Sequence, residues 1–348
     1  RLTFDEDRYA FKAALYSYRS NHGQWNTVWG DADAGWPLSL LLNREPLLDP
    51  EEQRRLGAVY ISGFLEATLH DNPAYVRLFR DSRSAASWLP EDLYITRFQD
   101  STFKAVADYE EDVNVATASL KGAALDGRRL ALWKEKDLSY RQGESTKRNQ
   151  VAYLGWKRDP KKPKETGTYA VRLSADNLAD LKLGTGSLLV FSLADSGEEP
   201  PDPKEKDKKK GEKTDAEKKA EEKEEERKQK EREAREEREK KEGKEPLDFT
   251  VVLVDAAGTT ARLPLSRFRP VPVPLKSHFT KLKNEEELYG DAWEPTLQTF
   301  ELPLRAFAAA KSGFDPATLR EVRFVFDRRP EGVVILDDLG FAEAAPRR

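Results

Sequence analysis

The sequence predicts a short α/β unit followed by an all-β sandwich or jelly roll that a long charged insert interrupts. Near its beginning, a strand-length apolar run is followed by a long amphipathic helix. Short apolar runs punctuated by Gly and Pro fill most of the remaining chain. Between two of these runs, 35 of the 42 residues from Lys204 to Glu245 are charged. We therefore expect four parts, with bounds 1–93, 94–203, 204–245 and 246–345.

The first part is predicted to hold one buried strand and two helices. The run from Phe11 to Tyr18 has strand length, and the polar residues after it suit a turn. Asp49 can cap a helix whose first position is Pro50. A second helical piece is expected from Pro73 to Asp81. The apolar positions of the long helix recur at helical spacing, at Leu56, Val59, Tyr60, Phe64 and Leu65.

From about Tyr94 the pattern becomes one of repeated short strands, which is typical of a sandwich or jelly roll. The runs are Arg129–Trp133, Val151–Trp156, Tyr169–Leu173, Ser187–Ser192, Asp248–Val254, Gln298–Leu302, Val322–Phe326 and Val333–Leu336.

The insert from Lys204 to Glu245 has almost no apolar side chain with which to form a core. It is expected to be disordered, or to form a solvated single helix held by Glu and Lys pairs at i,i+4 spacing. A coiled coil is not expected, because the insert lacks apolar residues at the a and d positions of a heptad. A solvated loop expansion is favoured over a binding element.

Charge and composition exclude several classes of function. The insert has a net charge of +1 and the remainder −5, so neither has the basic balance that favours nucleic-acid binding. Without Cys, thiolate nucleophiles, thiolate metal sites and disulfides are excluded. No run is long and apolar enough for a membrane span. The chain begins with Arg1 and contains no Met, so we expect a processed chain or a fragment.

His22 is the candidate catalytic residue. It lies in a loop at the carboxyl end of the first predicted strand, where α/β enzymes often place a general base. The alternative is a structural histidine packed beside Trp25 and Trp29.

The stretch from Tyr18 to Gly30 resembles the histidine loop of bacterial α/β-hydrolases of the esterase and lipase kind. The helix from Pro50 to Leu69 is similar to the closing helix of that family, in which the triad histidine comes last in the chain. The resemblance implies that His22 is the triad base of a serine ester hydrolase. It also implies an upstream hydrolase portion as partner, an ester substrate, no cofactor and a secreted or periplasmic location.

The other triad members are not found in this sequence. It contains no Gly-x-Ser-x-Gly motif, and 21 residues before His22 leave no room for a nucleophile strand. Neither the pair Asp5 and Asp7 nor the pair Asp31 and Asp33 is assigned to the triad. The nucleophile and the acid are therefore expected on sequence outside this chain.

The other two histidines are interpreted as structural or surface residues. His70 would end the long helix, where a protonated imidazole favours the negative end of the helix dipole. His278 lies in a Pro-punctuated segment and is expected in a surface loop or interdomain contact. No metal site is predicted, because the histidines lack the spacing of a zinc-binding helix.

The later runs, from Thr299 through Val322–Asp327 to Gly332–Phe341, resemble the final strands of galactose-binding-like jelly rolls. Such modules include carbohydrate-binding modules of bacterial enzymes. The resemblance implies opening strands at Tyr109–Val113 and Trp133–Glu135. It leaves a non-catalytic carbohydrate-binding or interaction module as the alternative to the hydrolase, and a structural scaffold whose charged insert tethers a partner as a third hypothesis.

Two sets of residues in this region are weaker candidates. The Asp337 and Asp338 pair could hold a structural Ca²⁺, but we favour turn capping and pairing with an arginine such as Arg328 or Arg329. Three tryptophans are candidate sugar platforms by residue type, although core or interface positions are favoured. They are Trp133, Trp156 and Trp293.

Overall fold

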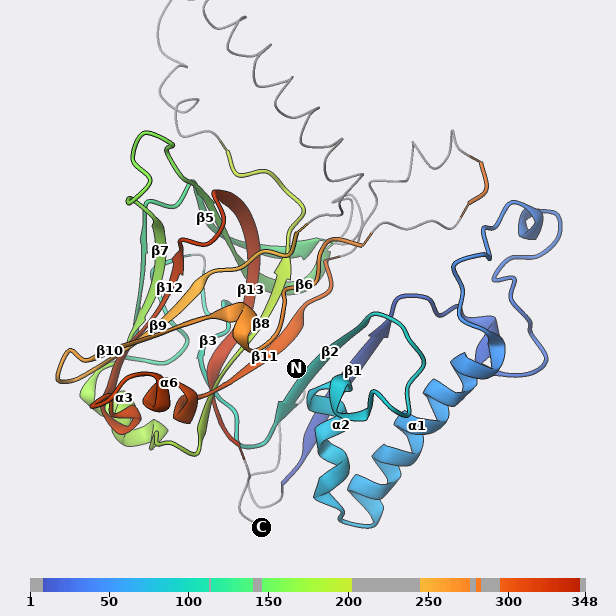
Figure 1. Ribbon diagram of the computed structural model, residues 1–348, viewed down its shortest axis with the longest axis horizontal. Coiled ribbons are helices and arrows are strands. Elements are labelled where there is room, and N and C mark those ends of the chain that lie inside the picture. The colour runs from blue at the N-terminus through green and yellow to red at the C-terminus, as the bar shows by residue number, and fades with distance from the viewer. Residues whose placement is uncertain are drawn as a thin grey trace, which may run out of the picture.

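The computed structural model describes residues 9–112, 114–139, 146–201, 245–275, 280–282 and 295–344. In these ranges two β-sheets form a sandwich, and a two-stranded sheet with helices lies beside it (Figure 1). We call residues 9–100 the front unit and the described residues after them the sandwich. The predicted all-β sandwich is therefore confirmed. The insert from Lys204 to Glu245, apart from its last residue, lies outside the described residues.

Every strand pairing in the sandwich is antiparallel. The five-stranded sheet has the order β10 (Thr260–Pro264), β9 (Thr250–Asp255), β12 (Leu319–Phe326), β7 (Gly167–Arg172) and β4 (Ala124–Arg128). The other sheet has the order β11 (Gln298–Pro303), β8 (Ser187–Asp195), β13 (Glu331–Glu343), β6 (Thr146–Lys157) and β5 (Leu132–Ser139), with β3 (Lys104–Ala107) on β13.

One apolar core fills the space between the two sheets. The Phe191 ring on β8 lies 5.0 Å from the Phe324 ring on β12, and Trp156 on β6 stacks on Phe326 at 4.3 Å between ring centroids. Burying each such side chain stabilises the fold by roughly 1.5–3 kcal/mol. Two short helices, α3 (Ala175–Leu181) and α6 (Leu304–Ala310), lie at the edges of the sheets.

Most of the strand runs predicted from the sequence coincide with observed strands, and the opening strand at Tyr109–Val113 is wrong. Residues 108–112 form a loop between β3 and β4. Tyr109 has a φ of 61°, which is outside the strand region, and its hydroxyl is hydrogen-bonded to that of Tyr169 at 3.0 Å. The buried tyrosine pair therefore fixes a turn where the apolar pattern suggested a strand.

The front unit is built on two antiparallel strands, β1 (Phe11–Ser17) and β2 (Tyr94–Asp100). The helix α1 (Pro50–Leu69) has the predicted bounds, and its cap Asp49 accepts a hydrogen bond from the Glu51 N–H at 2.9 Å. The predicted second piece is a 3-10 turn followed by α2 (Val76–Arg80). The 3-10 helices are η1 (Gly23–Trp25), η2 (Leu38–Leu40), η3 (Pro73–Tyr75), η4 (Ser82–Ala85), η6 (Leu265–Arg267) and η7 (Pro316–Thr318).

The pairing of β1 differs from that expected for the last strand of an α/β-hydrolase. In such a fold the strand would lie in a parallel sheet, whereas β1 pairs antiparallel with β2 in a two-stranded sheet of the described residues. The expected boundary between the first two parts of the chain lies at residue 93, so β2 was expected in the sandwich. It pairs instead with β1 of the front unit. The sequence pattern of β2 shows a strand but carries no information on its pairing partner.

Ion pairs and hydrogen bonds fix the front unit on the outer face of the six-stranded sheet. Arg80 on α2 forms ion pairs with Asp100 on β2 and with Glu301 on β11, the latter at 2.6 Å. The Phe98 N–H donates to Thr299 Oγ1 at 3.0 Å. We call Arg80, Asp100 and Glu301 the Arg80 cluster. In the described part of the chain, no helix combines the length and apolar character needed to cross a membrane.

Candidate functional site

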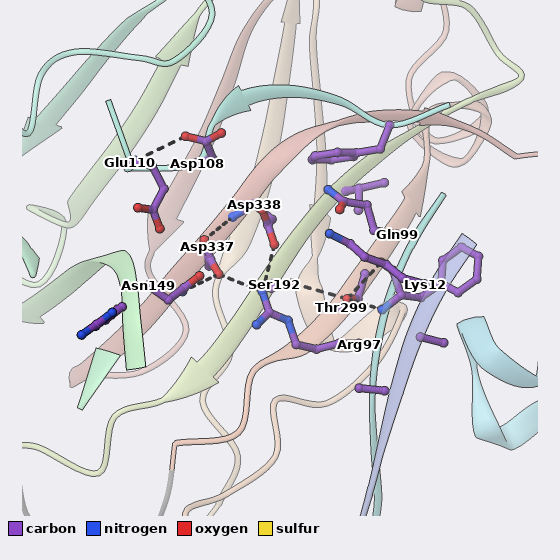
Figure 2. Close-up of a pocket in the computed structure, with 16 residues that line it drawn as sticks. Lys12, Arg97, Gln99, Asp108, Glu110, Asn149, Ser192, Thr299, Asp337 and Asp338 are labelled. Carbon is purple, nitrogen blue, oxygen red and sulfur yellow. Dashed lines mark hydrogen bonds and ion pairs between the residues drawn. The ribbon is translucent and has the colours of Figure 1, made fainter. Parts of the chain in front are cut away.

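A pocket of about 510 Å³ lies where the front unit meets the six-stranded sheet. Residues of β1 and β2 form one wall, and residues of β8, β11 and β13 form the other (Figure 2). This volume is in the range of sites that bind small molecules. Because the two walls belong to different units, the pocket exists only while the front unit is docked.

The lining combines both signs of charge with neutral polar and apolar groups. The apolar members are Ala13, Ala14, Phe98, Phe103 and Val190. The cations are Lys12, Arg97 and Arg148, and the acids are Asp108, Glu110, Asp337 and Asp338. The amides and hydroxyls are Gln99, Asn149, Ser192 and Thr299.

A bulge in β13 brings two neighbouring carboxylates toward the pocket. Asp337 is paired with Ser192 of β8, but the next residue of β13 that pairs with β8 is Gly340. In a regular strand, consecutive side chains point to opposite faces. Asp338 instead has a φ of 48°, which Asp tolerates better than most residues, and its N–H donates to Asp337 Oδ1 at 2.8 Å. Both carboxylates can therefore reach one arginine.

Asp337 is almost fully buried, with 2% of its surface exposed. Its Oδ2 accepts hydrogen bonds from Arg97 Nη2 at 2.9 Å and from Asn149 Nδ2 at 3.1 Å. Burial raises the pKa of this carboxyl to about 7, and the charge of Asp338 adds to the rise, although Arg97 and Asn149 act in the opposite direction. Near neutral pH, Asp337 can therefore either donate or accept a hydrogen bond.

Arg97 links the two walls of the pocket. It lies on β2 of the front unit, and its Nη2 is 2.9 Å from carboxylate oxygens of both Asp337 and Asp338 on β13 (Figure 2). The guanidinium group has five N–H donors in a planar fork, and both bonds leave from one nitrogen. The Nη1 and Nε groups lie in the same plane as the nitrogen that makes these two bonds.

The structure places His22 at the start of η1, a few residues after β1 ends. His22 is exposed, and its imidazole stacks on Trp29, with 5.4 Å between ring centroids. Asp33 accepts hydrogen bonds from the main-chain N–H groups of His22 and Gly23, at 2.9 and 3.0 Å. The Asp33 carboxylate therefore binds the main chain of the loop. It does not contact the imidazole nitrogens in these bonds, so it does not orient the His22 ring as a triad acid would.

The two candidate sugar platforms in the described residues pack in or against the core. Trp156 is 1% exposed, and its Nε1–H donates to the Arg329 carbonyl at 3.1 Å. Trp133 packs edge-on to Tyr169 at 6.2 Å, and a Cβ on Gly127 would stand 2.4 Å from its ring. Trp156 is therefore a core side chain, and Trp133 is half-buried against the core. Trp293 and His278 lie outside the described residues.

The acidic pair and His70 have partners close to those expected. Asp337 and Asp338 pair with an arginine, but it is Arg97, because Arg328 and Arg329 pair with Asp248 and Glu245. His70 caps α1 and lies with its Nδ1 3.2 Å from Glu66. Across the described ranges, no group of three or more His, Cys, Asp or Glu side chains is arranged to hold a metal ion.

Comparisons with known proteins give no family. No family model and no curated protein matches this chain. Among solved structures, it is similar to an exo-β-agarase, with 8% identity, a TM-score of 0.35, and coverage of 70% of this chain and 25% of that one. A second similar structure is a family 11 carbohydrate-binding module from Clostridium thermocellum in complex with a β-1,3-1,4-mixed-linked tetrasaccharide. It has 8% identity and a TM-score of 0.34, and the match covers 71% of this chain and 99% of the module. A family 30 carbohydrate-binding module has 10% identity and a TM-score of 0.32, and the match covers 63% of this chain and 91% of the module. The chain thus spans about a quarter of the agarase.

Proposed function

We propose that this chain is a non-catalytic binding module whose pocket between the front unit and the sandwich takes a neutral saccharide. The observation on which this rests is the make-up of the pocket. Around 510 Å³ of space it places three cations, four acids and four amides or hydroxyls. An anionic ligand would meet the carboxylates, and a cationic ligand would meet Arg97. A neutral ligand with many hydroxyls satisfies donors and acceptors together.

The apolar lining fits the same ligand class. A sugar ring has C–H faces as well as hydroxyls, and such faces pack on aromatic and aliphatic side chains. Phe103 and Val190 supply this surface beside the polar groups. Asp337 can donate a hydrogen bond to a sugar hydroxyl or accept one from it, because burial raises its pKa to about 7.

Isothermal titration calorimetry with neutral oligosaccharides tests the proposal, using the β-1,3-1,4-linked tetrasaccharide and agaro-oligosaccharides as probes. We expect Arg97→Gln to weaken binding by about 10-fold or more, because it removes charged hydrogen-bond donors. Arg128→Gln is the matched control, since Arg128 is exposed on the other sheet and pairs with Asp126. Equal affinity of the two variants, or binding of anionic oligosaccharides only, contradicts the proposal.

A second proposal is that the front unit is the carboxyl-terminal region of a serine ester hydrolase, with His22 as general base. It is favoured by the position of His22 in the loop after β1, where the exposed residue stacks its imidazole on Trp29. The nucleophile and acid would come from polypeptide outside this chain, and the ester substrate would lie against His22. Under either proposal a secreted or periplasmic location is expected, which cell fractionation tests.

For the second proposal, we expect His22→Ala in the full-length gene product to lower hydrolysis of nitrophenyl acetate by about 10³-fold or more, through loss of base catalysis. His70→Ala is the control, because that ring is exposed beside Glu66. Turnover by His22→Ala within a few-fold of the control rules out the catalytic role.

A further inference from the structure

Two neighbouring carboxylates in the wall of the pocket share one arginine. Nη2 of Arg97 lies 2.9 Å from an oxygen of Asp337 and 2.9 Å from an oxygen of Asp338. With both acids ionised, one positive charge faces two negative charges, so the three groups together have a net charge of −1. With one proton on the pair, their net charge is zero. The ionisation of a single carboxyl group thus decides whether this wall of the pocket is charged.

The hydrogen bonds of Asp337 indicate which of its oxygens carries this proton. Oδ2 accepts from Arg97 Nη2 and from Asn149 Nδ2, which occupies both of its lone pairs. Among the hydrogen bonds of the described residues, Oδ1 accepts one, from the Asp338 N–H at 2.8 Å. Oδ1 therefore keeps a lone pair for the proton, and the neutral carboxyl group has its O–H there.

A ligand would change the surroundings of the two acids differently. The Asp337 side chain is 3% exposed and the Asp338 side chain is 28% exposed. A sugar that contacts Arg97 and Asp338 displaces the water that remains beside Asp337. Loss of water disfavours the charged form of a carboxyl group, and a neutral saccharide brings no charge to compensate for it. Ligand binding therefore favours the protonated form of Asp337.

Charges of both signs surround Asp337 on the elements that line the pocket. The cations are Lys12 on β1, Arg97 on β2 and Arg148 on β6. The acids are Asp338 on β13 and, in the loop after β3, Asp108 and Glu110. The strands β8 and β11 contribute Ser192 and Thr299, whose hydroxyls are neutral. The charge of Asp337 also acts on the Tyr109 phenol, whose pKa burial raises well above its usual range, so that this group stays neutral.

We propose that the pocket binds its saccharide with Asp337 protonated, so that binding takes up a proton and weakens as the pH rises above neutrality. This regulation rests on the proposed function of the pocket. Because burial raises the pKa of Asp337 to about 7, the free protein loses above that pH a proton that the complex retains. For one proton, the dissociation constant of the saccharide should rise about 10-fold from about pH 6 to about pH 8.

Isothermal titration calorimetry across this pH range tests the proposal, with the β-1,3-1,4-linked tetrasaccharide and agaro-oligosaccharides as probes. At about pH 7, titrations in buffers of different ionisation enthalpy should show uptake of about half a proton per ligand. Asp337→Asn has the shape of the neutral carboxyl group and does not titrate, so its affinity should change less than about two-fold over the same range. Circular dichroism at each pH checks that the chain stays folded.

Glu135→Gln is the matched control. Burial also raises the pKa of Glu135 to about 7, and the charges of Glu111 and Asp112 add to the rise, but Glu135 lies outside the pocket lining. This variant should keep the 10-fold change of the unchanged chain. A dissociation constant that is constant or falls as the pH rises, or that still rises in Asp337→Asn, overturns the proposal and leaves saccharide binding standing. Absence of binding at every pH overturns both this proposal and the proposed function.

Discussion

Replacing Arg80 by leucine is expected to lower the free energy of unfolding by about 3 kcal/mol. The Arg80 side chain is 12% exposed and forms ion pairs with both Asp100 and Glu301. The side chains of these two acids are 1% and 20% exposed. Burial raises the pKa of Glu301, and the charge and hydrogen bond of Arg80 oppose this rise. Removing one partner of a buried ion pair leaves its counterpart desolvated and uncompensated, which costs about 3–5 kcal/mol.

Urea unfolding with intrinsic tryptophan fluorescence measures this effect. The matched control is Arg44→Leu, because Arg44 and Asp31 form an ion pair whose side chains are 41% and 47% exposed. That change should cost less than about 1 kcal/mol. Arg80→Leu should also weaken saccharide binding, since the Arg80 cluster holds the two walls of the pocket together. Equal stability of the two variants would show that the cluster does not hold the front unit in place.

The second large effect concerns pH. Burial raises the pKa of Asp337 to about 7, from an ordinary value of 3.8. Because the unfolded chain has the ordinary value, the folded chain retains this proton over a pH range in which the unfolded chain has lost it. The stabilising contribution of Asp337 is therefore complete below about pH 4 and is lost as the pH rises through about 7.

We expect the stability of the unchanged chain relative to Asp337→Asn to fall across this window, by at most about 1.4 kcal/mol per pH unit. Urea unfolding at several pH values measures the difference. Asp255→Asn is the control. Burial raises the pKa of Asp255, but hydrogen bonds from the Asp315 and Thr259 N–H groups, at 3.1 and 2.8 Å, outweigh it and lower the pKa overall. The stability of the unchanged chain relative to Asp255→Asn should not change with pH above about pH 5. If the stability relative to Asp337→Asn is also constant with pH, burial does not raise the pKa of Asp337.

Local signals in the sequence predicted much of the fold. Asp49 followed by Pro50 identified the start of α1, and the apolar period carried the helix to Leu69. The strand runs were found because they are apolar and bounded by turn residues. Pairing partners were not found in this way. β2 pairs with β1, which precedes it by more than 75 residues, and no local pattern encodes that choice.

The pocket could not be predicted for the same reason. The carboxylate pair was visible as Asp337-Asp338, but its partner Arg97 lies 240 residues earlier and Asn149 lies 188 residues earlier. Only the docking of the front unit brings these side chains together. The left-handed conformation of Asp338, which turns both carboxylates to one arginine, leaves no mark in the hydrophobic pattern.

A crystal structure of the full chain soaked with its tightest-binding neutral oligosaccharide tests the central claim most directly. The sugar should occupy the pocket, with ring hydroxyls within hydrogen-bond distance of Arg97 and Asp338 and a C–H face on Phe103. A sugar bound elsewhere, for example on the exposed rings of Trp29 and Trp36, with the pocket empty, would contradict the account.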